Sequence, residues 1–253
     1  MCLLAFAWQV GGQPLTLLGN RDEFHARPTR AADFWSAEGQ PDLLAGKDLQ
    51  AGGTWLGVTR RSRFATLTNI RAPGVRQGAL SRGALVLDYL RSNDPPGQYL
   101  QALADQQADF SPFNLLVGNP QELWLYNSEE RQPLRLQPGI YALSNGQLQS
   151  NWPKQLTLRE RLAANLQAAP DALLALLEDT HVYADELLPQ TGVNLEWERM
   201  LSAAFIVSQD YGTRSSSLLS ISGQEDIHFV ERRFGRNGKL LGESGWDLLP
   251  RRG

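Results

Sequence analysis

The chain begins with short apolar runs whose spacing predicts β-strands. Two short apolar runs, 3–10 and 15–19, are separated by Gly11-Gly12-Gln13-Pro14, and this pattern predicts an N-terminal β-hairpin. A second hairpin is predicted for 54–59 and 64–69, where strand-favouring residues flank a basic turn.

Helical spacing appears in the middle of the chain. Leucine and alanine recur at helical intervals over 81–92, and Asn93-Asp94-Pro95-Pro96 ends this predicted helix. Further helices are predicted at 97–107, 153–167 and 170–178. Strands are predicted at 113–117, 123–126, 139–144, 203–207, 216–221 and 227–234. The segments 24–46 and 183–198 show neither the helical nor the strand spacing of apolar residues. We therefore expect irregular structure in the first and a long loop in the second.

The order of these elements predicts the fold class. Runs of strands alternate with pairs of helices, which favours antiparallel sheets covered by helices over βαβ alternation. No segment rich in Gly, Ser or Pro marks a domain boundary, and 253 residues can bury one sizeable core. The sequence therefore predicts a single layered α+β domain over residues 1–253.

Charge and hydropathy exclude several classes of partner. The 24 Lys and Arg residues against 27 Asp and Glu give a net charge of -3, so nothing indicates nucleic-acid binding. No stretch approaches the roughly 18 apolar residues of a membrane span. The N-terminal apolar run lacks a preceding Lys or Arg and is broken early, unlike a signal peptide. We expect a cytoplasmic protein; no feature specifies its oligomeric state.

The single cysteine, Cys2, is the first candidate for chemistry. It follows Met1 directly, so removal of Met1 would give one residue both a thiol and a free α-amino group. Their ordinary pKa values, about 8.5 and about 7.7–8.0, allow the amine to act as base for the thiol. The alternative is that Cys2 is a small hydrophobic residue packed in the core.

A charged segment, Asn20-Arg21-Asp22-Glu23, follows the second predicted strand. A hairpin would return it close to Cys2, where a carboxylate could hold the protonated amine and Arg21 could favour the thiolate. The alternative is a solvated turn. Neighbouring strand residues face opposite sides, so Arg21 and Asp22 can both point at Cys2 only if the backbone turns there.

Two asparagines end predicted strands and could donate to an oxyanion. Asn69 and Asn145 occupy these positions, although Asn145 precedes Gly146 and this pair also forms turns. The segment Tyr211-Gly212-Thr213-Arg214 is either an anion-binding turn or a plain loop. The histidines, His25, His181 and His228, lack ligand spacing, so no metal site is expected.

Several motifs in sequence order together resemble a known family. They are Met1-Cys2, Gly19-Asn20-Arg21-Asp22-Glu23, Arg27-Pro28-Thr29, Gly52-Gly53-Thr54-Trp55-Leu56-Gly57, Leu67-Thr68-Asn69-Ile70-Arg71, Tyr141-Ala142-Leu143-Ser144-Asn145, Trp152-Pro153-Lys154 and Tyr211-Gly212-Thr213-Arg214. The chain thus resembles the NRDE family, also called the transport and Golgi organisation 2 family, over nearly its whole length. The resemblance implies an N-terminal-nucleophile hydrolase-like fold, a four-layer α-β-β-α sandwich of two antiparallel sheets.

The resemblance also implies roles for particular residues. More distantly the chain is similar to penicillin V acylases and bile-salt hydrolases, whose nucleophile, amine partner and two asparagines match Cys2, Asp22, Asn69 and Asn145 in position. Those acylases carry an arginine three residues before the aspartate, where this chain has Gly19. Either Arg21 turns toward the site or the arginine is lost. The residues expected to contact a ligand are Asn20, Arg21, Glu23, Trp55 and Arg214.

These implications leave three hypotheses for function. The first is hydrolysis of a non-peptide amide by the Cys2 thiolate, with no cofactor required. The second is a binding or trafficking protein that holds haem or acyl-coenzyme A in the same pocket, because the family is associated with both; the sequence has no Cys-Pro or Cys-x-x-Cys-His element to select haem. The third is an interaction protein with an inactive site. In the first two, the partner is a small molecule.

Overall fold

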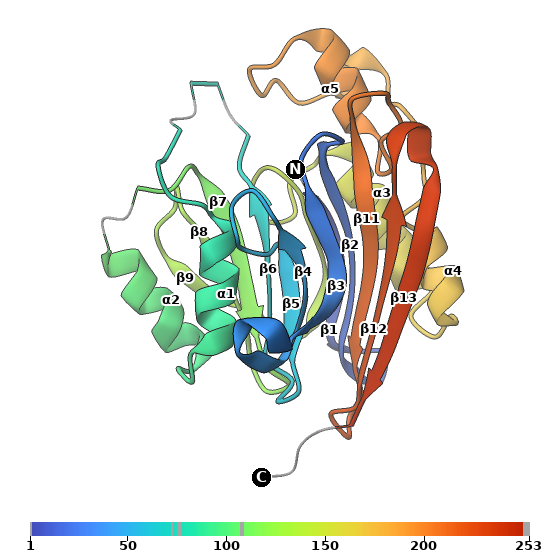
Figure 1. Cartoon of the computed structure of the whole chain (residues 1–253). Coiled ribbons are helices and arrows are strands. Elements are labelled where there is room, and N and C mark those ends of the chain that lie inside the picture. Colours follow the sequence, from blue (N-terminus) through green and yellow to red (C-terminus); the bar gives the residue numbers. More distant parts are fainter. Residues whose placement is uncertain (1, 72, 75–76, 107–108, 250–253) are drawn as a thin grey trace.

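Two antiparallel sheets packed face to face form the centre of the protein (Figure 1). The computed structural model describes residues 2–71, 73–74, 77–106 and 109–249. The six-stranded sheet has the order β10-β1-β2-β11-β12-β13, and the seven-stranded sheet the order β3-β4-β5-β6-β7-β8-β9. The strands of the first are β1 Cys2–Val10, β2 Gln13–Phe24, β10 Gly139–Leu143, β11 Tyr211–Ile221, β12 Ile227–Phe234 and β13 Leu240–Leu248. Those of the second are β3 Thr29–Trp35, β4 Gln40–Asp48, β5 Leu56–Thr59, β6 Phe64–Asn69, β7 Phe113–Gly118, β8 Leu123–Asn127 and β9 Pro133–Arg135.

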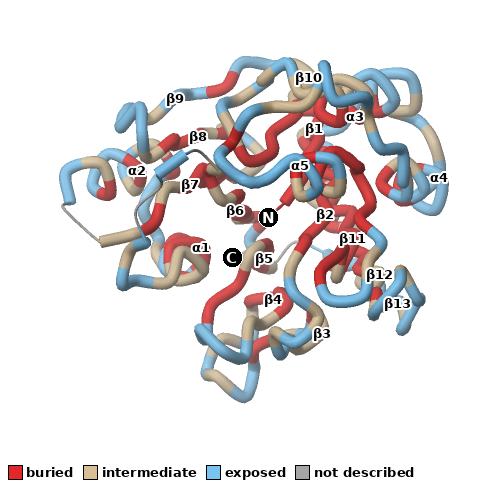
Figure 2. Tube along the Cα trace, turned by 90° about the horizontal axis from the view of Figure 1, so that it is seen from above, coloured by how far each residue is buried: buried red, intermediate tan, exposed pale blue. Residues whose placement is uncertain are grey.

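Helices cover the outer face of each sheet. Residues of α1 Gly83–Arg91 and α2 Pro96–Asp105 pack on the seven-stranded sheet, whereas α3 Pro153–Ala164 and α4 Pro170–Ala175 pack on the six-stranded one. A fifth helix, α5 Leu195–Ser202, carries its own small apolar cluster beside the start of β11. This arrangement confirms the predicted α-β-β-α sandwich. Seen from above, the buried strands lie at the centre and exposed segments surround them (Figure 2).

Strand β1 shows why the N-terminal run is apolar without interruption. Its even-numbered residues Leu4, Phe6 and Trp8 lie in the core between the sheets. Its odd-numbered residues, such as Leu3 and Ala5, pack beneath the helices. Because successive side chains point to opposite faces and both faces are covered, every position from Leu3 to Trp8 is apolar and buried.

Several sequence-based expectations were wrong in detail. The segment 24–46 is not irregular but contains β3 and most of β4, whose pairing shifts register twice and so breaks the simple alternation. Residues 203–207 do not form a strand, and α5 occupies the end of the expected 183–198 loop. The edge strands β9 and β13 were missed because both expose most of their side chains.

Among the described residues, no helix combines the length and apolar character needed to cross a membrane.

A close backbone contact fixes the start of α1 against the loop that follows β4. A Cβ atom added at Gly53 would lie 2.5 Å from the carbonyl carbon of Gly83. The Thr54 amide donates to the Gly83 carbonyl at 3.2 Å, so the two segments meet through their backbones. Glycine is required here by space rather than by its dihedral angles.

We therefore expect Gly53→Ala to lower the free energy of unfolding by about 1–3 kcal/mol, because the backbone of α1 must move away. Gly223→Ala is the matched control, since nothing lies within 4 Å of an added Cβ there, and it should change stability by less than about 0.5 kcal/mol. Urea unfolding measures both. Equal stability of the two variants would contradict the close contact.

Candidate active site around Cys2

Cys2 lies at the first position of β1, at the edge of a large pocket. Its side chain is 7% exposed. The pocket has a volume of about 440 Å³ and is lined by Cys2, Arg21, Asp22, Thr54, Trp55 and Asn69, among others. We call it the Cys2 pocket. The strand alternation places Cys2 on the same face as Leu4, so its thiol lies on the side of the second sheet.

Arg21 lies directly opposite Cys2 in the β1–β2 pair. Directly opposed residues share a face of the sheet, so the guanidinium and the thiol are on the same side. Arg21 is 6% exposed, and its guanidinium carbon lies 4.3 Å from the ring centroid of Trp55. Its hydrogen bond to Thr29 Oγ1 is long, at 3.4 Å. Arg21 therefore reaches the Cys2 pocket without any turn of the backbone. It supplies an arginine at the pocket although position 19 is a glycine.

Gly19 packs directly against Leu4, so a larger residue at this position would have to displace the Leu4 side chain. It pairs with Leu4, and an added Cβ would lie 2.8 Å from the Leu4 side chain. Leu4 of the inter-sheet core thus occupies the space beside Gly19.

Asp22 occupies the opposite face, toward the helices. It is buried and accepts a hydrogen bond of 2.7 Å from Thr213 Oγ1. Burial raises the pKa of the Asp22 carboxyl, while the nearby Lys154 ammonium opposes that rise. Because Cys2 begins the strand, its thiol and its backbone nitrogen diverge. Cys2 therefore faces Arg21 with its side chain, and the Asp22 charge also acts on it, since it raises the pKa of the Cys2 thiol.

Lys154 is a residue of this site whose role the sequence did not indicate. It is fully buried at the start of α3, and its ammonium donates to the Leu201 carbonyl at 2.7 Å. Burial lowers the pKa of Lys154 to about 8, and the Asp22 charge opposes this shift. The only signal in the sequence was its place in the Trp152-Pro153-Lys154 motif.

The two asparagines have different positions. Asn69 ends β6 and lines the Cys2 pocket. Asn145 follows β10, is buried, and donates its side-chain amide to the Asn69 carbonyl at 2.8 Å. Beside it, Ser144 Oγ donates to the Cys2 carbonyl at 3.1 Å. Asn145 and Ser144 thus tie β1, which begins at Cys2, to β6 of the other sheet, which ends at Asn69.

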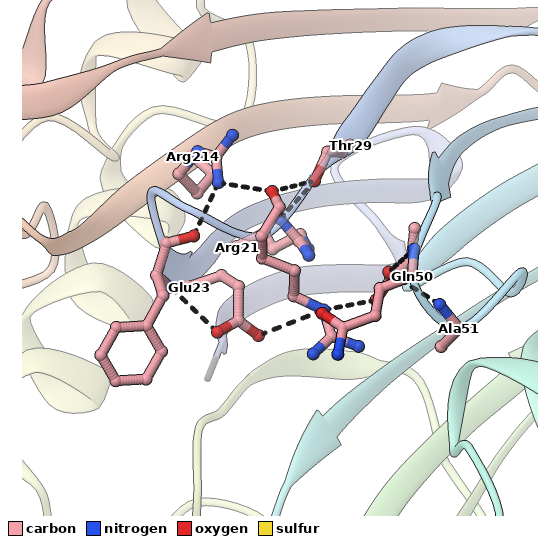
Figure 3. A network of polar contacts seen from close by, with 9 residues as sticks. Arg21, Glu23, Thr29, Gln50, Ala51 and Arg214 are labelled. Carbon is pink, nitrogen blue, oxygen red and sulfur yellow. Dashed lines mark hydrogen bonds and ion pairs between the residues drawn. The ribbon is translucent and has the colours of Figure 1, made fainter.

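The remaining expected ligand contacts divide between rim and core. Glu23 and Trp55 line the pocket. Asn20 lies on the helix-facing side instead, and its amide donates to the carbonyls of Leu177 and Ala204 at 2.9 and 2.8 Å. Arg214 donates to the carbonyl of Phe24 at 2.8 Å, which steadies the chain beside Glu23 (Figure 3).

Most charges on the pocket rim are already paired. Arg27 forms an ion pair of 2.7 Å with Asp48 and lies 4.0 Å from Glu23. The other oxygen of Asp48 accepts from the amides of Gln50 and Ala51 (Figure 3). No group of three metal-ligating side chains gathers anywhere in the described parts of the chain. Charged and polar side chains predominate in the lining of the pocket.

These features define the class of protein: a sandwich with the N-terminal-nucleophile hydrolase fold and a cysteine at the start of its first strand. A solved structure with a similar fold is the Caenorhabditis elegans N-acylethanolamine-hydrolyzing acid amidase ortholog, with a TM-score of 0.50 and 14% identity over 70% of this chain and 85% of that one.

The family follows from sequence comparison. Residues 1–236 match the family model described as Transport and Golgi organisation 2, and the chain belongs to this family. The Transport and Golgi organization protein 2 homolog of Bos taurus is 31% identical over 92% of both chains. The human homolog is 30% identical over the same shares.

The charge of Arg21 should affect how readily the Cys2 thiol ionises. Burial raises the pKa of the Cys2 thiol, and the Arg21 charge acts against this shift. Removal of the cation should raise the pKa further, so the thiolate forms only at higher pH. We expect Arg21→Met to move the pH midpoint of Cys2 alkylation by iodoacetamide upward.

The midpoint is the measured quantity because loss of a large side chain also changes access to the thiol. Arg91→Met, an exposed change on α1, should leave the midpoint unchanged. An unchanged midpoint in Arg21→Met would show that the guanidinium does not act on the thiol.

Proposed function

We propose that the protein is an amidohydrolase whose nucleophile is Cys2 after removal of Met1. One observation carries this proposal: the only cysteine of the chain begins β1 at the wall of a polar pocket, with Arg21 directly opposite it on β2 and the Asp22 charge within electrostatic reach. An isolated buried cysteine would need none of these neighbours.

The buried thiol needs a base. Because burial raises its pKa, the thiol is protonated near neutral pH, and the free α-amine of Cys2 is the nearest group able to accept its proton. The thiolate then attacks the amide carbonyl carbon to form a tetrahedral oxyanion. The protonated amine returns its proton to the leaving nitrogen as the C–N bond breaks. Water attacks the resulting thioester, releases a carboxylic acid and restores the thiol.

Neighbouring residues have distinct parts in this mechanism. Asp22 stabilises the protonated amine, and Lys154 limits the cost of keeping that carboxylate buried. Asn69 is the side-chain donor on the pocket wall for the oxyanion. The Asn145 amide is held on the Asn69 carbonyl, so Asn145 positions Asn69 and can donate to the oxyanion only with its remaining hydrogen.

The likeness in fold is compatible with this chemistry. The nematode protein is named for hydrolysing N-acylethanolamines, which are amides.

A binding protein is the second candidate, and the raised pKa of Cys2 favours it. A protonated thiol is a poor nucleophile and also a poor haem ligand. No histidine is among the pocket-lining residues that the structure describes, so the residues present do not fit haem. The arginines suit the phosphates of acyl-coenzyme A better.

The hydrolase proposal predicts that Met1 is removed and that the mature protein hydrolyses amides. Intact mass should show the mature protein lighter by one methionine residue. Turnover of a panel of N-acyl-7-amino-4-methylcoumarin amides should fall about a thousandfold or more in Cys2→Ala.

A matched control alters only the amine. A removable N-terminal extension keeps the Cys2 side chain but blocks its α-amino group, so this form should be inactive until a protease cleaves immediately before Cys2. Retention of Met1, or equal turnover with and without the extension, would refute the mechanism. Saturable binding of acyl-coenzyme A without turnover would favour the second candidate.

A further inference from the structure

A second, smaller cavity adjoins the Cys2 pocket behind Arg21. Its volume is about 100 Å³, and Arg21 and Trp55 line both spaces. Its charged and polar lining consists of Arg21, Thr29, Arg30, Arg214, Ser215, Glu231 and Arg233. We call it the arginine cavity.

Strand pairing explains why these side chains meet. Ser215 of β11 pairs with Arg21 of β2 on one side and with Arg233 of β12 on the other. The three residues therefore form a row across three strands on one face of the sheet. A register shift between Thr213 and Ser215 places Arg214 at a bulge, and Arg30 comes from β3 of the other sheet.

The lining atoms are unusual in lacking partners. Arg30 Nε, Arg214 Nε, Arg233 Nε and Ser215 Oγ are buried and have no hydrogen-bond partner among the described residues. Ser215 is only 3% exposed. Buried polar groups are nearly always hydrogen-bonded, so four such atoms around one cavity indicate that something else satisfies them.

The charge of the lining selects the kind of partner. Glu231 is the carboxylate of this lining; it accepts from the Ala32 amide at 2.8 Å, and burial raises its pKa. Arg30 pairs with Glu38 at 2.8 Å. Arg21, Arg214 and Arg233 thus face one buried carboxylate. A single water needs only roughly 10–15 Å³, so the cavity has room for a larger occupant. Water would satisfy the hydrogen bonds but not the excess positive charge, whereas an oxyanion satisfies both.

We propose that the arginine cavity binds a small oxyanion, a carboxylate or a phosphate group, through Arg21, Arg214, Arg233 and Ser215. The anion is either free in solution or the charged end of a molecule whose remainder occupies the Cys2 pocket. Both sources share the same chemistry of recognition.

The first experiment titrates inorganic phosphate into the protein by calorimetry at constant ionic strength. Arg233→Gln should weaken binding about tenfold or more, and Ser215→Ala about threefold, because a charged and a neutral donor are lost. Ser215 Oγ makes no hydrogen bond with any residue that the structure describes, so Ser215→Ala tests the site even if the arginine variant fails to fold. Arg135→Gln, an exposed change on β9, should have no effect.

Phosphate binding is independent of the hydrolase proposal. Cys2 is not among the residues that line the arginine cavity, so Cys2→Ala should bind phosphate as the parent protein does. Loss of amide turnover and loss of anion binding can therefore be told apart.

The second experiment identifies the source of the anion. N-phenylacetylglycine, which carries a carboxylate, is compared with the neutral N-phenylacetylglycinamide as protector of Cys2 against iodoacetamide. Stronger protection by the anionic probe, abolished by Arg233→Gln or by phosphate, assigns the cavity to a substrate's charged end. Phosphate binding without such competition assigns it to a free ion. If phosphate shows no saturable binding and the two probes protect equally, the cavity holds water only and the proposal is overturned.

Discussion

The antiparallel pairing of β1 with β2 is the constraint on which the site depends. It sets Cys2 opposite Arg21, and the alternation of side chains then sends Asp22 to the other face. The thiol and the guanidinium lie on the face between the sheets, while the Asp22 carboxylate and Lys154 lie on the face beneath the helices, within electrostatic reach of each other. A slip of one residue would exchange these faces and separate every pair. The core on both sides of β1 makes such a slip costly, since it would carry Leu4 and Phe6 out of the inter-sheet core.

Burying so many charged groups is unfavourable unless each has a partner. Asp22 has the Thr213 hydroxyl and the field of Lys154, and Lys154 has a backbone carbonyl from the end of α5. Arg21 stacks on the face of Trp55 and forms no ion pair with the carboxylates of the described residues. An arrangement that stabilised only the fold could use apolar residues at these positions. Retaining the charges is consistent with a site that moves protons and binds anions.

The sequence pattern predicted most strands, and the family resemblance added the four layers. Arg21 and Asp22 lie close to Cys2 because a hairpin returns residue 21 to residue 2 whatever surrounds it. Asn69 comes from the other sheet, and only the family resemblance indicated it. Lys154 and the row through Ser215 and Arg233 could not be found in this way. They depend on contacts between residues far apart in the chain. A lysine in the first turn of a helix would normally be predicted to be exposed to solvent. Asn20 was expected to contact a ligand because it belongs to a charged motif. Its amide instead donates to the backbone carbonyls of Leu177 and Ala204.

The central claim, that Cys2 is a nucleophile toward acyl groups, is tested most directly by trapping the acyl-enzyme. The protein with a free Cys2 amine is mixed with a p-nitrophenyl ester, quenched in acid, and mapped by peptide mass spectrometry. The account predicts a stoichiometric burst of p-nitrophenolate and an acyl group on the N-terminal peptide that contains Cys2. A burst of equal size in Cys2→Ala, or an acyl group on any other residue alone, would contradict it.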